Sequence, residues 1–206
     1  MPGGKITVAG LLLAAGEARR MGPGGQHKLL AEFDGCALVR RSAQTLLSSR
    51  LHPVIVVTGH QHSRIGSALL GLEVEQQFNP AYGTGIGSSL ARGFSHPAIT
   101  KADGTLVMLA DMPAINPGHI DQLVQTFRQH GGNVLARASC NGQRGNPVII
   151  PKALYGAMRH LSGDSGARSL IERSELPIVD VETGPAALLD VDTPEAVIRA
   201  GGVLKN

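Results

Sequence analysis

The first residues that could do chemistry are three cations in a glycine-rich loop. Arg19, Arg20 and Lys28 follow Gly16 within the stretch TVAGLLLAAGEARRMGPGGQHKLL, which starts at Thr7. Glycines let a backbone approach a ligand closely, and bare N–H groups together with cationic side chains bind phosphates. The loop follows an apolar run that is typical of a buried strand. This pattern predicts a phosphate-binding loop, with a solvated basic loop as the alternative.

Two common phosphate-binding motifs are excluded at this loop. The P-loop needs a glycine directly before the lysine and Ser or Thr after it, whereas the context here is QHKL. The dinucleotide motif G-x-G-x-x-G is missing after the first apolar run, and GTGIGSS at 83–89 follows FNPAY, which is a poor strand ending. Neither zinc-binding histidine spacing nor a G-x-S-x-G elbow occurs, which disfavours a zinc enzyme and a serine hydrolase.

Three aspartates are candidates for holding Mg²⁺. Asp111 closes the apolar run TLVMLA, and a carboxylate at the carboxyl end of a strand can hold Mg²⁺ against substrate phosphates. Asp190 and Asp192, in LLDVDTPEAV, point the same way along an extended strand because side chains alternate with period two. The alternatives are an aspartate before a turn for Asp111 and favourable charge at a helix start for the pair.

Short apolar runs that alternate with helical patterns must position these groups. Continuous Val/Ile/Leu runs predict buried parallel strands covered on both faces, at 5–14, 53–59 and 104–111. Helical spacing predicts helices over 37–49, 63–71 and 116–132. The second half is expected to add strands at 133–140, 145–151, 176–182 and 187–192, and helices at 151–161, 165–173 and 193–202. The alternation predicts an α/β fold with a mainly parallel sheet.

Length and composition restrict the class of protein. A chain of 206 residues with 42% hydrophobic residues is expected to form one domain over 1–206. Because the pattern changes to shorter elements in the second half, we expect the N-terminal half to bind the nucleotide and the C-terminal half to bind the acceptor. A mild net charge of +3 and 3% aromatic residues favour an anionic small molecule over nucleic acid. The first apolar run is too short to span a membrane. Cys36 and Cys140 match no zinc motif and are expected to stay reduced in a cytoplasmic protein.

Six motifs, taken in order, resemble the nucleotidyltransferases of the molybdenum-cofactor maturation group. LLLAAGEARRMG…HKLL resembles the first nucleotide loop of that family, NPAYGTGIGSSLARG its second nucleotide loop and LADMP its metal strand. RGNPV, GDSGAR and LLDVDTPEA resemble its later landmarks, so that the resemblance extends from Leu11 to about Val197. It implies a single-domain, three-layer α/β/α, Rossmann-like nucleotidyltransferase fold with a mostly parallel sheet.

The resemblance also implies a reaction and its residues. In such enzymes the terminal phosphate of molybdopterin attacks the α-phosphorus of a nucleoside triphosphate, and pyrophosphate leaves. Arg20, Lys28 and Asp111 are implied as catalytic, and Asp111 and Asp192 as Mg²⁺ ligands with Asp190 in reserve. The implied nucleotide-binding residues are Leu13, Ala14, Ala15, Gly16, Arg20, Lys28, Asn79, Gly85, Ser89 and Asp111.

Within that group the resemblance is to enzymes that use CTP. Guanine users tend to carry LAGG, whereas LAAG at 13–16 places a methyl group at Ala15. CTP and a molybdopterin-type cofactor are therefore the implied substrates, with a molybdenum hydroxylase as the implied client and neither nucleic acid nor membrane as a partner. Three alternatives stay open: a guanylyltransferase that uses GTP, a nucleotidyltransferase for another small phosphate or alcohol, and a non-catalytic nucleotide-binding accessory protein.

The chain departs from the family pattern at three places. Ala18 replaces the usual serine, which removes one polar contact to the nucleotide. The insertion GPGGQ lengthens the segment between Arg20 and Lys28. Asn146 stands where a histidine is frequent, at a position that helps to select the second substrate.

Overall fold

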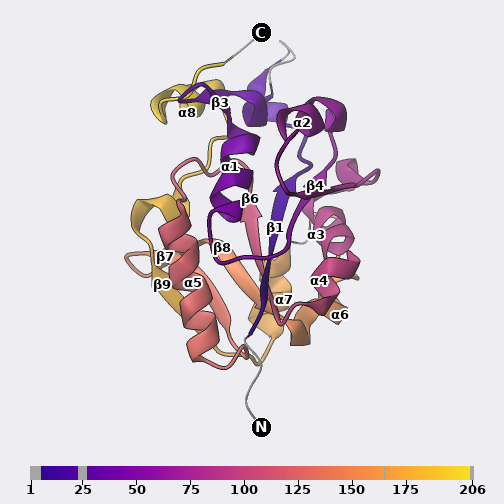
Figure 1. Cartoon of the computed structure of the whole chain (residues 1–206), viewed down its shortest axis with the longest axis vertical. Coiled ribbons are helices and arrows are strands. Elements are labelled where there is room, and N and C mark those ends of the chain that lie inside the picture. Colours follow the sequence, from indigo (N-terminus) through magenta and orange to yellow (C-terminus); the bar gives the residue numbers. More distant parts are fainter. Residues whose placement is uncertain (1–5, 23–26, 165, 205–206) are drawn as a thin grey trace.

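A seven-stranded, mostly parallel sheet forms the centre of the molecule (Figure 1). The computed structural model describes residues 6–22, 27–164 and 166–204. The strand order is β5-β4-β1-β6-β8-β7-β9, and only β8 runs antiparallel to its neighbours. The strands are β1 Val8–Ala14, β4 Val54–Thr58, β5 Glu75–Phe78, β6 Gly104–Leu109, β7 Leu135–Cys140, β8 Gln143–Pro151 and β9 Ile178–Glu182.

The central strands are apolar on both faces because helices cover both sides of the sheet. Every residue of β1 and β4 is buried. Along β1, Val8 and Leu12 belong to one hydrophobic cluster, while Leu11 and Leu13 belong to a second cluster on the opposite face. This alternation is what period two dictates for a strand that is buried on both sides.

Two layers of helices enclose the sheet (Figure 1). One layer packs on the cluster that contains Leu12, and it consists of α1 Leu38–Leu47, α2 His62–Ala68 and α5 Pro117–Gln129. The other packs on the cluster that contains Leu11, and it consists of α3 Ile86–Phe94, α4 Pro97–Lys101, α6 Tyr155–Met158 and α7 Ala167–Arg173. The three-layer α/β/α fold with a mostly parallel sheet that was expected from the sequence is confirmed.

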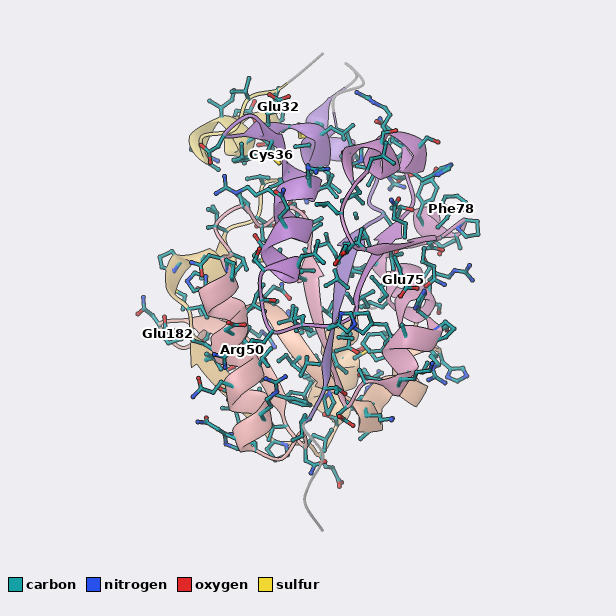
Figure 2. All side chains as sticks on the ribbon, viewed as in Figure 1. Glu32, Cys36, Arg50, Glu75, Phe78 and Glu182 are labelled. Atoms are coloured by element: carbon teal, nitrogen blue, oxygen red, sulfur yellow. The ribbon has the colours of Figure 1, made fainter. Side chains whose placement is uncertain are left out.

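Short elements complete the chain. The hairpin of β2 Glu32–Phe33 and β3 Cys36–Ala37 lies beside the C-terminal segment, because Glu32 pairs with Val203. Cys36 lies on this hairpin at one end of the molecule (Figure 2), and both Cys36 and Cys140 are free. The remaining helix is α8 Pro194–Arg199, and the 3₁₀ helices are η1 Arg19–Met21, η2 Lys28–Leu30, η3 Tyr82–Thr84, η4 Lys152–Leu154 and η5 Gly184–Leu188.

The topology creates a crevice between β1 and β6. From β1 the chain proceeds to β4 and β5 on one side, and it then returns to β6 on the other side. In open α/β sheets, ligands bind beyond the carboxyl ends of the strands at such a switch point. The loops that follow Ala14 and Leu109 leave the sheet at this edge, and they contain the Gly16 loop and Asp111.

One predicted element is wrong. The strand expected at 187–192 is absent, because the chain forms η5 there and then continues without regular structure. This segment crosses β7 and β8 instead of lying beside β9, and a Cβ on Gly145 would come within 2.3 Å of the Ala187 carbonyl oxygen. The Val191 amide donates a 3.0 Å hydrogen bond to the Asp111 carbonyl oxygen. This bond holds the segment beside the crevice.

The helix expected at 151–161 forms as the short η4 and α6. β5, α3 and the β2–β3 hairpin are additional elements that no sequence pattern predicted. Lys5, Ser165 and residues 23–26 of the GPGGQ segment lie outside the described residues. Within the described ranges, no helix has the length and apolar character needed to cross a bilayer.

Candidate functional site

A cavity of about 460 Å³ opens at the carboxyl ends of β1 and β6. Its wall consists of the Gly16 loop, Lys28 on η2, the loop from Tyr82 to α3, and three aspartates that follow β6, precede α7 and precede α8. The volume lies within the range of small-molecule sites. The wall carries both signs of charge, from Arg19, Arg20, Lys28, Glu17, Asp111, Asp164 and Asp192.

The Gly16 loop leaves β1 and turns immediately. Ala18 adopts a left-handed conformation with φ of 52°, after which η1 carries Arg19 and Arg20. The Arg20 guanidinium donates a 2.6 Å hydrogen bond to Asp192 Oδ2, while Arg19 Nε pairs with Glu17 Oε2 at 2.5 Å. The loop therefore places cationic side chains along the wall that also carries the aspartates.

Lys28 lies among the carboxylates of the cavity. Its ammonium donates to Asp111 Oδ2 and to Asp192 Oδ1, the second contact being 2.6 Å, and only 12% of its side chain is exposed. Burial favours the neutral amine, but the charge and hydrogen bonds of Asp111 and Asp192 outweigh it and raise the pKa of Lys28. Lys28 is therefore a fixed positive charge at the carboxyl end of β6.

Three carboxylates form a group that fits a divalent cation. Oxygens of Asp111, Asp190 and Asp192 all lie within 4.8 Å of one another. Asp111 Oδ1 is buried and has no hydrogen-bond partner among the described residues. A buried carboxylate oxygen without a partner is costly unless a cation takes it, and Mg²⁺ and Mn²⁺ prefer such oxygen ligands. The residues present therefore fit the Mg²⁺ expected from the sequence.

The two aspartates before α8 are in different electrostatic environments. Burial, together with the charges of Asp192 and Asp111, raises the pKa of Asp190. Burial also disfavours ionised Asp192, but Lys28 and then Arg20 hold its pKa below the usual range. Asp192 is consequently the more firmly ionised of the two, and the ionised carboxylate is the form that binds a metal ion.

The second loop closes the opposite wall. The buried Asn79 amide donates to Ser88 Oγ and Ser89 Oγ at 2.9 and 3.0 Å, which fixes the loop before α3. Gly85 has a φ of +115°, and a Cβ there would lie 2.4 Å from Gly163 backbone atoms. The Gly87 amide donates to the Gly163 carbonyl at 2.9 Å, so this loop and the segment before α7 are held together.

The structure brings most of the predicted residues to one cavity. The wall includes Leu13, Ala15, Gly16, Arg20, Lys28, Gly85, Ser89, Asp111 and Asp192. Ala14 and Asn79 are buried beside the cavity and are not in its wall. Glu17, Tyr82, Ile86 and Asp164 also line the cavity; all four lie within the quoted motifs, but none of them was predicted as a site residue.

Known proteins resemble this chain over most of its length. The family model described as MobA-like NTP transferase domain matches residues 10–178. Purine catabolism protein PucB of Bacillus subtilis is 30% identical over 196 residues, which are 90% of this chain and 92% of that protein. Nicotine blue oxidoreductase of Paenarthrobacter nicotinovorans is 32% identical over 203 residues, 93% of this chain and 95% of that protein. A molybdenum cofactor guanylyltransferase of Mesorhizobium japonicum is 26% identical and covers 97% of both chains.

Solved structures share the fold. A nucleotidyl transferase from Methanothermobacter thermautotroptrophicus superposes with a TM-score of 0.80 at 21% identity, covering 94% of this chain and 95% of that one. Rv0371C of Mycobacterium tuberculosis, solved in complex with manganese, superposes with a TM-score of 0.71 at 22% identity, covering 94% and 97%.

Proposed function

Because this chain belongs to the MobA-like NTP transferase family, we propose that it transfers CMP from CTP to a molybdopterin-type molybdenum cofactor and releases pyrophosphate. The membership makes it a nucleotidyltransferase, and the nucleotide and the acceptor are the proposed part. The observation that carries the proposal is the group of Asp111, Asp190 and Asp192 beside Lys28 in a cavity at the switch point. A molybdenum hydroxylase would be the client that receives the product.

The side chains of the cavity have complementary tasks in this reaction. Arg20 and Lys28 would hold phosphate oxygens, since guanidinium and ammonium groups bind phosphate strongly. Asp111 and Asp192 would hold Mg²⁺, which when bound supplies positive charge to the phosphate oxygens. Transfer of a phosphorus group depends mainly on such positioning and charge, and it needs no covalent step on the protein.

Ala15 supports CTP as the nucleotide. It is 4% exposed, lies in the cavity wall and packs so closely on Gly59 that a Cβ there would lie 2.8 Å from the Ala15 methyl carbon. Because of this packing, the methyl group has no space to move away from the cavity. It therefore reduces the room for a purine base and favours the smaller cytosine. GTP is the second candidate, because the guanylyltransferase of Mesorhizobium japonicum is a relative over nearly the whole chain.

A nucleotide panel tests the proposal. The shift of the unfolding temperature is measured with CTP, GTP, ATP and UTP, each with and without Mg²⁺. A ligand at 100 times its Kd stabilises the folded state by about 2.7 kcal/mol, which is a readily measured shift. The proposal predicts the largest shift with CTP and Mg²⁺. An equal or larger shift with GTP would contradict the choice of CTP and leave the nucleotidyltransferase assignment in place.

A further inference from the structure

His27 is a buried titratable side chain that the proposed reaction does not use. It precedes Lys28, is 3% exposed and stacks on His60 with ring centroids 5.6 Å apart. Its Nε2 lies 3.2 Å from the Gly16 carbonyl oxygen, and its Nδ1 accepts a 3.3 Å hydrogen bond from the Leu29 amide. Because Nδ1 accepts, the proton lies on Nε2, and that N–H donates to Gly16.

This ring joins two parts of the cavity wall. Through Gly16 it holds the loop after β1, and through Leu29 it caps η2, the 3₁₀ helix that carries Lys28. The neutral form makes both hydrogen bonds, and burial lowers the pKa of His27 to about 4, so that the neutral form prevails near pH 7. One uncharged ring therefore sets the position of the loop relative to the Lys28 ammonium.

The carbonyl groups of the loop determine where its amides point. A trans peptide directs its C=O and its N–H to opposite sides, and the only cis peptides among the described residues precede Pro53 and Pro147. Ala15 O accepts from the His60 amide at 3.1 Å, and Gly16 O accepts from His27. Both carbonyls thus face the histidine pair, and the amides of the same two peptides, those of Gly16 and Glu17, face the other way.

Those two amides have no acceptor among the described residues, and both residues line the cavity. Ala18, which follows, is left-handed, and a left-handed residue is one component of the backbone turns whose successive amides bind anions. We propose that His27 is a positioning residue for the triphosphate, which turns the Glu17 amide into the cavity and fixes its distance from Lys28. The inference rests on the proposed function only in taking a triphosphate as the ligand.

Binding of inorganic tripolyphosphate with Mg²⁺, measured by calorimetry, tests this role without a base or an acceptor. His27→Phe keeps a ring for the stack with His60 but loses both hydrogen bonds, and it should bind tripolyphosphate roughly ten- to a hundredfold more weakly. His27→Gln keeps an amide N–H donor for Gly16 and should stay within about threefold of the wild type. His130→Phe, at an exposed histidine at the end of α5, is the matched control and should change nothing.

The outcomes separate this role from mere packing and from the proposed function. Equal losses in His27→Phe and His27→Gln, or full binding by His27→Phe, would overturn the positioning role. A wild type that binds CTP but shows no involvement of His27 would leave the proposed function standing. A wild type that binds neither tripolyphosphate nor CTP would overturn both.

A measurement on the wild type covers the case in which His27→Phe does not fold. Tripolyphosphate added to ¹⁵N-labelled protein should shift the Glu17 amide resonance strongly, because that N–H donates to a phosphate oxygen. If the Glu17 amide resonance does not shift while the Lys28 amide resonance does, the proposed role of the Glu17 amide, and with it that of His27, is overturned.

Discussion

Lys28 and a divalent cation would bind the same two carboxylates. The ammonium already contacts Asp111 Oδ2 and Asp192 Oδ1. A cation that enters this group must share or displace those contacts, whereas the phosphates of a nucleotide offer the ammonium other partners. At the residue scale, competition for Asp111 and Asp192 thus links metal binding to nucleotide binding.

Replacement of Lys28 should have opposite effects on the two ligands. Lys28→Met is expected to raise the Mn²⁺ affinity of the nucleotide-free protein roughly tenfold, because a competing charge is removed. The same change should weaken tripolyphosphate binding and slow turnover. Calorimetry with Mn²⁺ checks the first effect, and Lys101→Met, at an exposed lysine of α4, is the control. Unchanged affinity for both ligands would contradict the placement of Lys28 at the site.

Asp111 should be indispensable for turnover. Asp111→Asn preserves the shape of the side chain but removes one negative charge from the cation site, and it should lower the rate of pyrophosphate release by roughly a hundredfold or more. Asp121→Asn, on the surface helix α5 where Asp121 pairs with Arg50, should release pyrophosphate at the wild-type rate. A near-normal rate for Asp111→Asn would rule out this metal site.

His27 should make stability depend on pH. Burial is the main cause that lowers its pKa from 6.5 to about 4, and the nearby charges of His60, Lys28 and Arg64 act in the same direction. Between these two pH values the unfolded chain binds the proton more tightly than the folded protein does. The contribution of neutral His27 to the free energy of unfolding is therefore complete above pH 6.5 and is lost as the pH falls towards 4. The loss is about 2–3 kcal/mol at pH 4.5. Urea unfolding at pH 7 and pH 4.5 should show this extra loss in the wild type and not in His27→Gln; equal losses would contradict it.

At the scale of elements, contact between α3 and β1 determines how the loop before α3 is positioned relative to the Gly16 loop after β1. Gly93 of α3 lies against Leu11, and a Cβ at Gly93 would come within 2.6 Å of a Leu11 methyl carbon. Leu11 is fully buried and has little room to move. The spacing of these two elements therefore depends on the absence of a side chain at Gly93.

Alanine substitutions at two helical glycines test this packing. Gly93→Ala should lower the free energy of unfolding by about 1–3 kcal/mol, because the methyl group overpacks the core. Gly156→Ala in α6, where a Cβ would meet no atom within 4 Å, should instead be neutral or raise it by up to about 1 kcal/mol. Urea unfolding of both variants gives the two values. Equal effects of the two substitutions would show that α3 can move away from β1.

The difference between buried and exposed strands explains which elements could be predicted from the sequence. β1, β4 and β6 are continuous apolar runs because helices cover both faces, so the sequence shows them directly. β5 is an edge strand whose sequence, EQQF, is mostly exposed and polar, and it leaves no such signal (Figure 2 shows Phe78 at the edge of the molecule). The segment 187–192 alternates like a strand, but contact with β8 and the bond from Val191 to Asp111 hold it elsewhere.

The site was predictable in part for a related reason. Motifs identify Lys28, Asp111 and Asp192 separately, and the end of each strand indicates which edge of the sheet they share. Their direct contacts join positions 83 and 164 residues apart, and local pattern carries no information on such pairs. The role of His27 also stays hidden in the sequence, because it depends on which carbonyl the buried ring meets.

At the scale of the whole molecule, the sheet brings two parts of the chain to one cavity. The chain up to Asp111 supplies the Gly16 loop, Lys28 and Asp111 itself, and the later part supplies Asp164 and Asp192. Carboxylates grouped beside a lysine can hold a divalent cation against phosphate oxygens, as nucleotidyl transfer requires. Nucleotidyl transfer is therefore expected to take place in this cavity.

Transfer of label from α-³²P-labelled CTP tests that claim most directly. The wild-type protein is incubated with labelled CTP, Mg²⁺ and a molybdopterin-type cofactor, in parallel with labelled GTP and with the Asp111→Asn variant. The account predicts labelled cofactor and an equal amount of pyrophosphate from CTP, much less from GTP, and almost none with Asp111→Asn. Absence of labelled cofactor with every nucleotide, or equal transfer by Asp111→Asn, would contradict it.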